Sequence, residues 1–107
     1  MAQRKPRPRI VVAPAARDDL ASIWRWNANQ YGVRHADAYI AFLSEGFQRL
    51  ARTSPQGRPI ADRPGLFYVI LKRRQGGHGH IVVYRPGDGA IDILRVFHTA
   101  EDWPGKL

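Results

Sequence analysis

Residues His80–His98 read HIVVYRPGDGAIDILRVFH, two apolar and β-branched runs joined by Pro86-Gly87-Asp88-Gly89. Runs of this composition favour β-strands. An Asp-Gly pair between two such runs is typical of a hairpin turn, because glycine tolerates the positive φ that these turns need. The stretch therefore predicts a β-hairpin, and the rest of the chain is interpreted around it.

The alternation of side chains along the second run predicts which of them share a face. A period of two places one set together on one face of the strand: Ile91, Ile93, Arg95 and Phe97. Leu94 and Val96 are then expected on the opposite face. Because apolar side chains stand on both faces, the hairpin is expected inside a sheet with other elements packed on it. The polar side chains are expected to gather near one end, where function should be sought first: Tyr84, Arg85, Arg95 and His98.

Length and composition point to one small globular domain. The chain has 107 residues and no cysteine, which excludes disulfide frameworks and thiolate metal sites and fits a reducing cytoplasm. No apolar run approaches the roughly 18 residues that span a bilayer. The basic start MAQRKPRPR lacks the apolar region of a secretory signal. We therefore expect a cytoplasmic protein that makes no membrane contact.

The net charge of +8 is the strongest bulk feature of the chain. Basic domains of this size bind nucleic acid, anionic membranes or acidic proteins, and charge alone does not distinguish these partners. Residues 1–8 are rich in proline and charge, so we expect a flexible basic arm there and a single domain over residues 9–107.

Two helices are expected before the hairpin. Ile10-Val11-Val12 predicts a short first strand, and Pro14 suits the first turn of a helix that ends at Tyr31-Gly32. A second helix over about Arg34–Thr53 carries an apolar stripe: Ala36, Ile40, Leu43, Phe47 and Leu50. The short connection between the two helices predicts an antiparallel αα-hairpin.

The fold class follows from the order of these elements. Leu66–Arg73 predicts a strand before the hairpin, and Thr99-Ala100-Glu101-Asp102 resembles a capping box that opens a final turn. Trp103 is expected to pack before Pro104 stops that turn. The chain is therefore predicted to be an α+β two-layer domain of β-α-α-β-β-β order, with an antiparallel sheet packed against the αα-hairpin and a short C-terminal helix.

Standard catalytic and cofactor-binding signatures are absent, so we expect no cofactor and no metal. His78 and His80 in a glycine-rich turn suggest a metal only weakly. If the chain is a metal-free ribonuclease, its catalytic set is drawn from four residues: His98, Arg95, Tyr84 and Arg73. The structural alternative is that His98 closes the strand and that Arg95 pairs with Asp92 or with the helix layer.

Aromatic residues in the helices are expected to pack in the core, but Trp24 and Trp26 cannot both face one side of their helix. One of them is therefore available to a partner protein. Together with the basic side chains of the sheet, they give the expected partner-binding set: Trp24, Trp26, Lys72, Arg73, Arg74, Arg85 and Arg95.

From about Arg9 to its C-terminus the chain resembles the RelE/ParE toxin superfamily, and its ParE branch most closely. The resemblance lies in A-x-x-D-L at Ala16–Leu20, LARTSPQGR at Leu50–Arg58, H-I-V-V-Y-R at His80–Arg85 and I-x-I-L-R-V-x-H-x-x-x-D at Ile91–Asp102. It implies a type II toxin held inactive by a cognate antitoxin whose C-terminal segment wraps it. An antitoxin segment that suits so basic a toxin would be acidic, amphipathic and disordered alone. Operator DNA would be reached only through the antitoxin.

The resemblance offers two targets. ParE-like members poison DNA gyrase, whereas RelE-like members cleave mRNA on the ribosome, and His98 and Arg95 occupy places that match the ribonuclease sets. However, Thr99 follows His98 where some ribonuclease branches carry tyrosine, and Leu66–Arg73 contains no glutamate. These departures favour gyrase over the ribosome and mRNA as the target.

Overall fold

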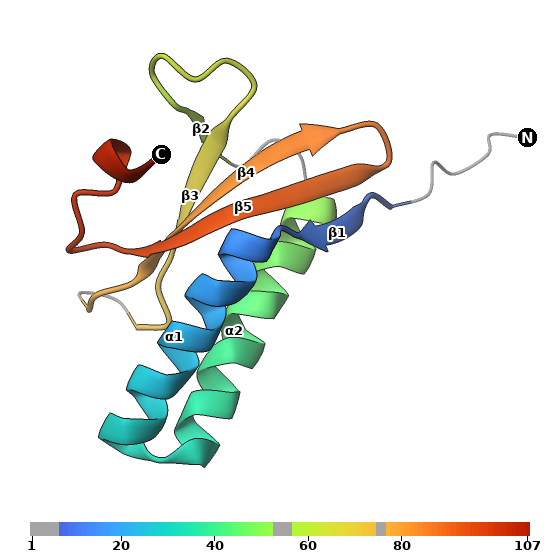
Figure 1. The fold of residues 1–107 in the computed structure, drawn as a ribbon. Coiled ribbons are helices and arrows are strands. Elements are labelled where there is room, and N and C mark those ends of the chain that lie inside the picture. Colours follow the sequence, from blue (N-terminus) through green and yellow to red (C-terminus); the bar gives the residue numbers. More distant parts are fainter. Residues whose placement is uncertain (1–6, 53–56, 75–76) are drawn as a thin grey trace, which may run out of the picture.

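Two helices pack side by side on one face of a five-stranded sheet (Figure 1). The computed structural model describes residues 7–52, 57–74 and 77–107. The elements along the chain are β1 (Arg9–Val12), α1 (Pro14–Tyr31), α2 (Val33–Arg52), β2 (Arg58–Pro59), β3 (Phe67–Leu71), β4 (His80–Gly87), β5 (Ala90–His98) and the short 3₁₀ helix η1 (Pro104–Lys106). The α+β class, the αα-hairpin and the short C-terminal helix are confirmed. Most of the predicted arm, and parts of the predicted loop and turn at 53–56 and 75–76, lie outside the described residues.

The central hairpin forms as predicted. β4 and β5 pair antiparallel from Gly87↔Ala90 at the turn to His80↔His98 at the open end. Asp88-Gly89 makes the turn, and Gly89 adopts a φ of 72°, a conformation that glycine accepts without steric cost. Tyr84 and Arg85 lie on the turn side of the register shift and His98 at the open end, so the expected grouping of polar residues at one end is wrong.

The alternation predicted along β5 is also wrong, because the strand contains an irregularity. Val83 pairs with Arg95 while Tyr84 pairs with Ile93, which leaves Leu94 as an extra residue. An extra residue shifts the period of two and exchanges the faces beyond it. Ile93 therefore lies on the helix side of the sheet, whereas Phe97 belongs to a separate cluster.

The sheet is mixed rather than wholly antiparallel. Its strand order is β1-β5-β4-β3-β2, and β1 lies at one edge, where it runs parallel to β5. The two-residue strand β2, which was not predicted, pairs with β3 at the other edge. Only Tyr68 and Phe67 of β3 pair with it, so the rest of β3 forms an open edge in the described part of the chain.

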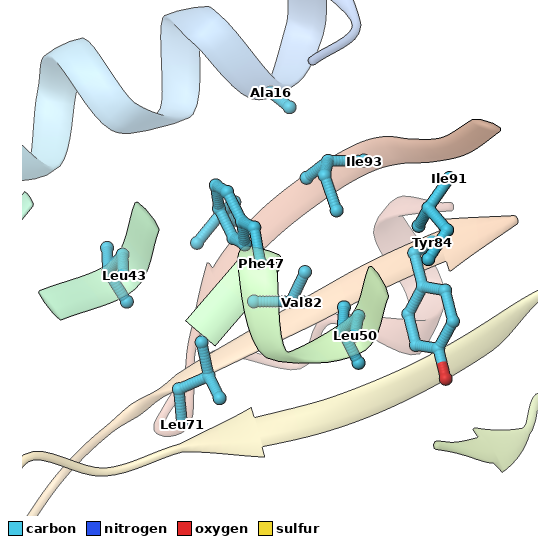
Figure 2. Close-up of a cluster of buried hydrophobic side chains, with 10 residues drawn as sticks. Ala16, Leu43, Phe47, Leu50, Leu71, Val82, Tyr84, Ile91 and Ile93 are labelled. Atoms are coloured by element: carbon cyan, nitrogen blue, oxygen red, sulfur yellow. The ribbon is translucent and has the colours of Figure 1, made fainter. Parts of the chain in front are cut away.

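The core lies between the helices and the sheet. Figure 2 shows the side chains of this inner cluster, which brings together residues of α1, α2 and strands β3, β4 and β5: Ala16, Leu43, Phe47, Leu50, Leu71, Val82, Tyr84, Ile91, Ile93 and Val96. The stripe predicted on α2 supplies Leu43, Phe47 and Leu50, each less than 10% exposed. The predicted helix start at Pro14 and end at Gly32 are also confirmed.

A smaller outer cluster covers the opposite face of the sheet. Ile81, Val83 and Phe97 are buried there, and Trp103 packs on them with its ring 6.2 Å from that of Phe97. The packing of Trp103 is confirmed, but Pro104 begins η1 instead of stopping a turn. Glu101 Oε1 accepts a hydrogen bond from the backbone N–H of His98, which ties this segment to the end of β5. No helix in the described ranges is long and apolar enough to cross a membrane.

Candidate functional site

A cleft of about 720 Å³ lies between α1 and the open end of the β4–β5 hairpin. We name it the imidazole cleft, because three histidines stand along one side. The hairpin side is formed by His78, His80, Val96, His98 and Glu101, and the helix side by Asp19, Ser22, Ile23, Trp26, Asn27 and Tyr31 of α1 with Tyr39 of α2. The cleft therefore combines titratable groups with exposed aromatic side chains.

The three imidazoles are brought together by strand register. His80 and His98 pair across β4 and β5, and their ring centroids lie 5.4 Å apart. His78, two residues before β4 begins at His80, places its ring 5.3 Å from that of His98. Within residues 7–52, 57–74 and 77–107, no group of three or more histidines and carboxylates is arranged to hold a metal ion. The cluster thus gathers hydrogen-bonding side chains at the open end of the hairpin.

His80 is the most buried of these histidines. The Tyr39 hydroxyl lies 2.5 Å from its Nδ1. Burial, reinforced by His98 and opposed by Glu101, lowers the pKa of His80 to about 4. Burial also raises the pKa of Tyr39. At neutral pH the tyrosine therefore keeps its proton and donates it in a hydrogen bond to an uncharged imidazole.

The two carboxylates of the cleft are each engaged with a cation. Glu101 accepts hydrogen bonds from Lys106 Nζ at 2.7 Å and from the backbone N–H of His98 at 2.9 Å, and these contacts lower its pKa. Asp19 accepts from Arg95 Nε at 2.8 Å, from Arg95 Nη2 at 3.1 Å and from the backbone N–H of Val96 at 2.9 Å. Neither acid presents an unmatched negative charge to the cleft.

The structure separates the four residues considered for a ribonuclease. His98 lines the cleft, but Arg95 is held by Asp19, as the alternative of pairing with the helix layer expects. Tyr84 is 4% exposed and belongs to the inner cluster. Arg73 follows β3 and lies close enough to Tyr39 to act on its pKa. The ring neighbours of His98 are thus His78 and His80, whereas Arg95 and Tyr84 are engaged elsewhere.

The residues expected to bind a partner lie in four places. Trp24 is half-buried and its Nε1 donates to Asp37 at 2.8 Å, whereas Trp26 is 57% exposed and lines the cleft. Lys72, Arg73 and Arg74 are exposed just after β3. Arg85 is exposed near the hairpin turn, where it pairs with Asp92 at 3.2 Å, and Arg95 is the partner of Asp19. Of this set, Trp26 is the side chain that faces the cleft.

Sequence reasoning missed His80, Tyr39 and Asp19 as residues of the cleft. A usable signal existed for His80, because counting back from the Asp88-Gly89 turn places it opposite the end of the second run, near His98. Tyr39 falls under the expectation that aromatic residues of the helices pack in the core, so its hydroxyl carries no signal in the sequence. Asp19 is the acid of the A-x-x-D-L motif, but that motif does not indicate its contacts, since its partners lie 76 and 77 residues away along the chain.

Comparison with known proteins shows which family the chain is similar to. The model of the ParE toxin of type II toxin–antitoxin systems matches residues 10–103. Toxin ParE1 of Mycobacterium tuberculosis is 32% identical over 96 residues, which cover 88% of this chain and 92% of that toxin. Toxin RelE3 of Caulobacter vibrioides is 30% identical over 92 residues, 86% of this chain and 95% of that protein. A chain of the chromosomal ParDE toxin–antitoxin system of P. aeruginosa superimposes with a TM-score of 0.72 at 22% identity, over 85% of this chain and 95% of that one, which shows a shared fold.

Proposed function

The chain belongs to the ParE toxin family of type II toxin–antitoxin systems, and we propose that it acts in the cytoplasm by inhibiting DNA gyrase until a cognate antitoxin neutralises it. The match over residues 10–103 carries this proposal, because it includes both helices, every strand but the first residue of β1, and the whole imidazole cleft. The net charge of +8 fits a protein that engages acidic partner surfaces.

The arrangement of side chains supports a binding mode of action over chemistry. Two of the four ribonuclease candidates are engaged elsewhere, since Arg95 is held by Asp19 and Tyr84 is buried in the inner cluster. A ribonuclease would need cations at the developing phosphorane charge, close to its acid and base. Exposed aromatic and basic side chains, by contrast, are common anchors of protein interfaces.

The first experiment measures supercoiling of relaxed plasmid by purified gyrase with and without the toxin. Inhibition or trapped cleavage complexes, relieved by the antitoxin, is the expected result. The matched control is heat-denatured toxin at the same concentration, which excludes a nonspecific effect of a basic polypeptide on DNA. Normal supercoiling at excess toxin would contradict the gyrase proposal.

A ribosome-dependent endoribonuclease remains the alternative, and one observation favours it. His98 stands in an open cleft beside His80 and Tyr39, so groups able to move a proton lie close together. If the toxin cleaves mRNA on the ribosome with His98 as acid or base, His98→Ala should reduce cleavage by about 100-fold or more. Inhibition of gyrase involves no such proton transfer and should not fall by that factor. Translation-dependent cleavage of mRNA, measured with both proteins, separates the two.

The antitoxin is proposed to use the exposed aromatic surface of α1. Trp26 is the better candidate anchor, because Trp24 is committed to Asp37. Truncation of an aromatic anchor commonly costs about 2 kcal/mol or more of binding free energy. We therefore expect Trp26→Ala to weaken the antitoxin complex more than Trp24→Ala, as measured by titration calorimetry. Unchanged affinity in both variants would remove α1 from the interface.

A further inference from the structure

The net charge of the toxin is concentrated in its first 17 residues. They contain five basic residues and no Asp or Glu, so they carry +5 of the net +8. The other twelve basic residues share the rest of the chain with all nine carboxylates. A basic segment that precedes a folded domain is typical of proteins that bind nucleic acid. The five basic residues are Arg4, Lys5, Arg7, Arg9 and Arg17.

The structure describes three of these residues, and all three are exposed beside β1, the strand at one edge of the sheet (Figure 1). Arg9 opens β1 and pairs with Ala90 next to the hairpin turn. Arg7 lies two residues before it, and Arg17 lies near the start of α1, which follows β1 after one residue. Three basic side chains therefore come together at this edge.

The neighbouring acids do not neutralise this edge. In the described part of the chain, the three arginines form no ion pair with a carboxylate. Asp92, on the strand next to β1, is matched by Arg85 at 3.2 Å. Two exposed carboxylates remain nearby, Asp18 and Asp88, so three arginines leave an excess of positive charge. The two basic residues earlier in the sequence add to that excess.

The segment Arg7-Pro8-Arg9 has the chemistry and the spacing of a phosphate-binding segment. Proline has no N–H and keeps the residue before it extended. Two residues of extended chain span about 6.6 Å, and one strand of duplex DNA carries a phosphate every ~3.4 Å along its axis. Arg7 and Arg9 can therefore reach phosphates of one strand together. Each planar guanidinium can donate two hydrogen bonds to a phosphate.

The surface around β1 offers little to an apolar partner. Val11, 40% exposed, is the one large apolar side chain that is exposed between residues 7 and 17. The exposed rings that suit a protein interface, Trp26 and Tyr31, lie toward the other end of α1. A membrane anchor likewise needs apolar side chains to insert. A partner that presents phosphates therefore fits this edge best.

We propose that the toxin itself binds the phosphate backbone of duplex DNA through Arg7, Arg9 and Arg17, together with the basic residues before them. The contact reads no base sequence, so it is distinct from recognition of operator DNA, which we expect only through the antitoxin. It would let the toxin hold the DNA on which gyrase acts. That role, unlike the contact itself, rests on the proposed function.

The test measures binding of a fluorescently labelled duplex of mixed sequence by anisotropy at about 50, 100 and 200 mM salt. Each phosphate contact contributes about −0.9 to the slope of log affinity against log salt. The triple variant Arg7→Gln, Arg9→Gln and Arg17→Gln, named the β1 variant, should therefore reduce the magnitude of the slope by about 3. Its binding at the lowest salt concentration should weaken by about tenfold or more.

The matched control is the triple variant Lys72→Gln, Arg73→Gln and Arg74→Gln, which removes the same charge from three exposed positions after β3. Strands β5 and β4 separate β3 from β1, so these positions lie outside the proposed contact. The control should keep the wild-type slope to within about 1. All six substituted positions are exposed, so both variants should fold, which urea denaturation checks.

Several results would overturn the contact. They are an absence of DNA binding by the wild type at the lowest salt, equal slopes in the wild type and the β1 variant, and an equal loss of slope in the control. Weaker antitoxin binding by the β1 variant with an unchanged DNA slope would assign these arginines to an acidic protein. Tighter binding of single-stranded RNA of the same length, dependent on the same arginines, would assign them to RNA.

Supercoiling assays separate the contact from the proposed function. The β1 variant should need about tenfold more toxin than the wild type for the same inhibition of gyrase, and the control should match the wild type. A wild-type toxin that binds DNA through these arginines and leaves supercoiling unchanged would contradict gyrase inhibition, while the contact would stand. Equal inhibition by the β1 variant and the wild type would overturn the role of the contact on gyrase.

Discussion

The buried side chain of His80 makes the folding stability depend on pH. It is 8% exposed, bonded to Tyr39, and its pKa of about 4 lies below the 6.5 of an unperturbed imidazole. The unfolded chain therefore takes up a proton at this residue as the pH falls through about 6.5, whereas the folded chain does so only near 4. Folding stability should fall across that window.

The prediction for His80 is a loss of about 2–4 kcal/mol of unfolding free energy from this residue between about pH 7 and pH 4. Urea denaturation of the wild type and of His80→Gln at several pH values measures it. Glutamine can accept the hydrogen bond of Tyr39 but does not titrate, so the variant should show the shallower pH dependence. Parallel curves for the two proteins would contradict the assigned pKa.

Asp19 joins α1 to the edge of β5 through three hydrogen bonds, two from Arg95 and one from the backbone of Val96. The Asp19 side chain is 16% exposed and that of Arg95 31%, so Asp19→Ala leaves a partly buried guanidinium and a backbone N–H without their acceptor. We expect a loss of about 1–3 kcal/mol of stability by thermal or chemical denaturation. Asp18→Ala, at an exposed neighbouring position of the same helix, should change stability by less than about 0.5 kcal/mol. Equal effects of the two changes would refute the role given to Asp19.

Among the secondary-structure elements, those marked by a local pattern were the ones predicted from sequence. The hairpin turn carries Asp88-Gly89, α1 starts at Pro14, and α2 has its apolar stripe, so each was placed correctly. The irregularity at Leu94 has no such mark, because it depends on how β5 pairs with β4 rather than on its own residues. One unpredicted residue was enough to move Phe97 to the other face.

The turn before β4 has no room for a side chain at Gly79. A Cβ on Gly79 would stand 2.4 Å from the backbone oxygen of Leu71, and its N–H and C=O both bond to Thr99. Backbone at that distance cannot rotate away as a side chain can, so we expect Gly79→Ala to cost about 1–3 kcal/mol of stability. Gly77→Ala, whose Cβ would meet its nearest neighbour at 3.6 Å, is the matched control. Chemical denaturation of both variants compares them, and equal stabilities would mean that the loop at Gly79 relaxes freely.

In the molecule as a whole, the sequence predicted the layers better than the site. Element order and the apolar stripe of α2 imply one helix layer on one sheet, and the structure has that arrangement (Figure 1). The cleft could not be predicted in this way, because Trp26, Tyr39 and His98 come from separate elements. They line one cleft only because the open end of the hairpin lies against the helices. Groups far apart in sequence that share no motif cannot be joined by local reasoning.

Trp103 and Trp26 lie on opposite sides of the sheet, and we expect different roles for them. Trp103 covers the outer cluster, with its ring 5.0 Å from Tyr68 and 6.2 Å from Phe97, and Arg63 holds the C-terminal segment by donating to the carbonyl of Leu107. Trp26 stands on the helix side, 57% exposed at the imidazole cleft. Stability should therefore depend on the first ring and partner binding on the second.

We expect Trp103→Ala to lower the unfolding free energy by about 1–3 kcal/mol, because truncating a half-buried aromatic ring costs less stability than truncating a fully buried one. Antitoxin affinity of the folded variant should stay within about twofold, since Trp103 does not line the cleft. Trp26→Ala should do the reverse, with stability nearly unchanged and weaker antitoxin binding. Urea denaturation and calorimetry on both variants test this exchange of effects. If Trp103→Ala weakened binding while leaving stability intact, the outer face of the sheet would have to be the interface, and the imidazole cleft would lose its assigned partner.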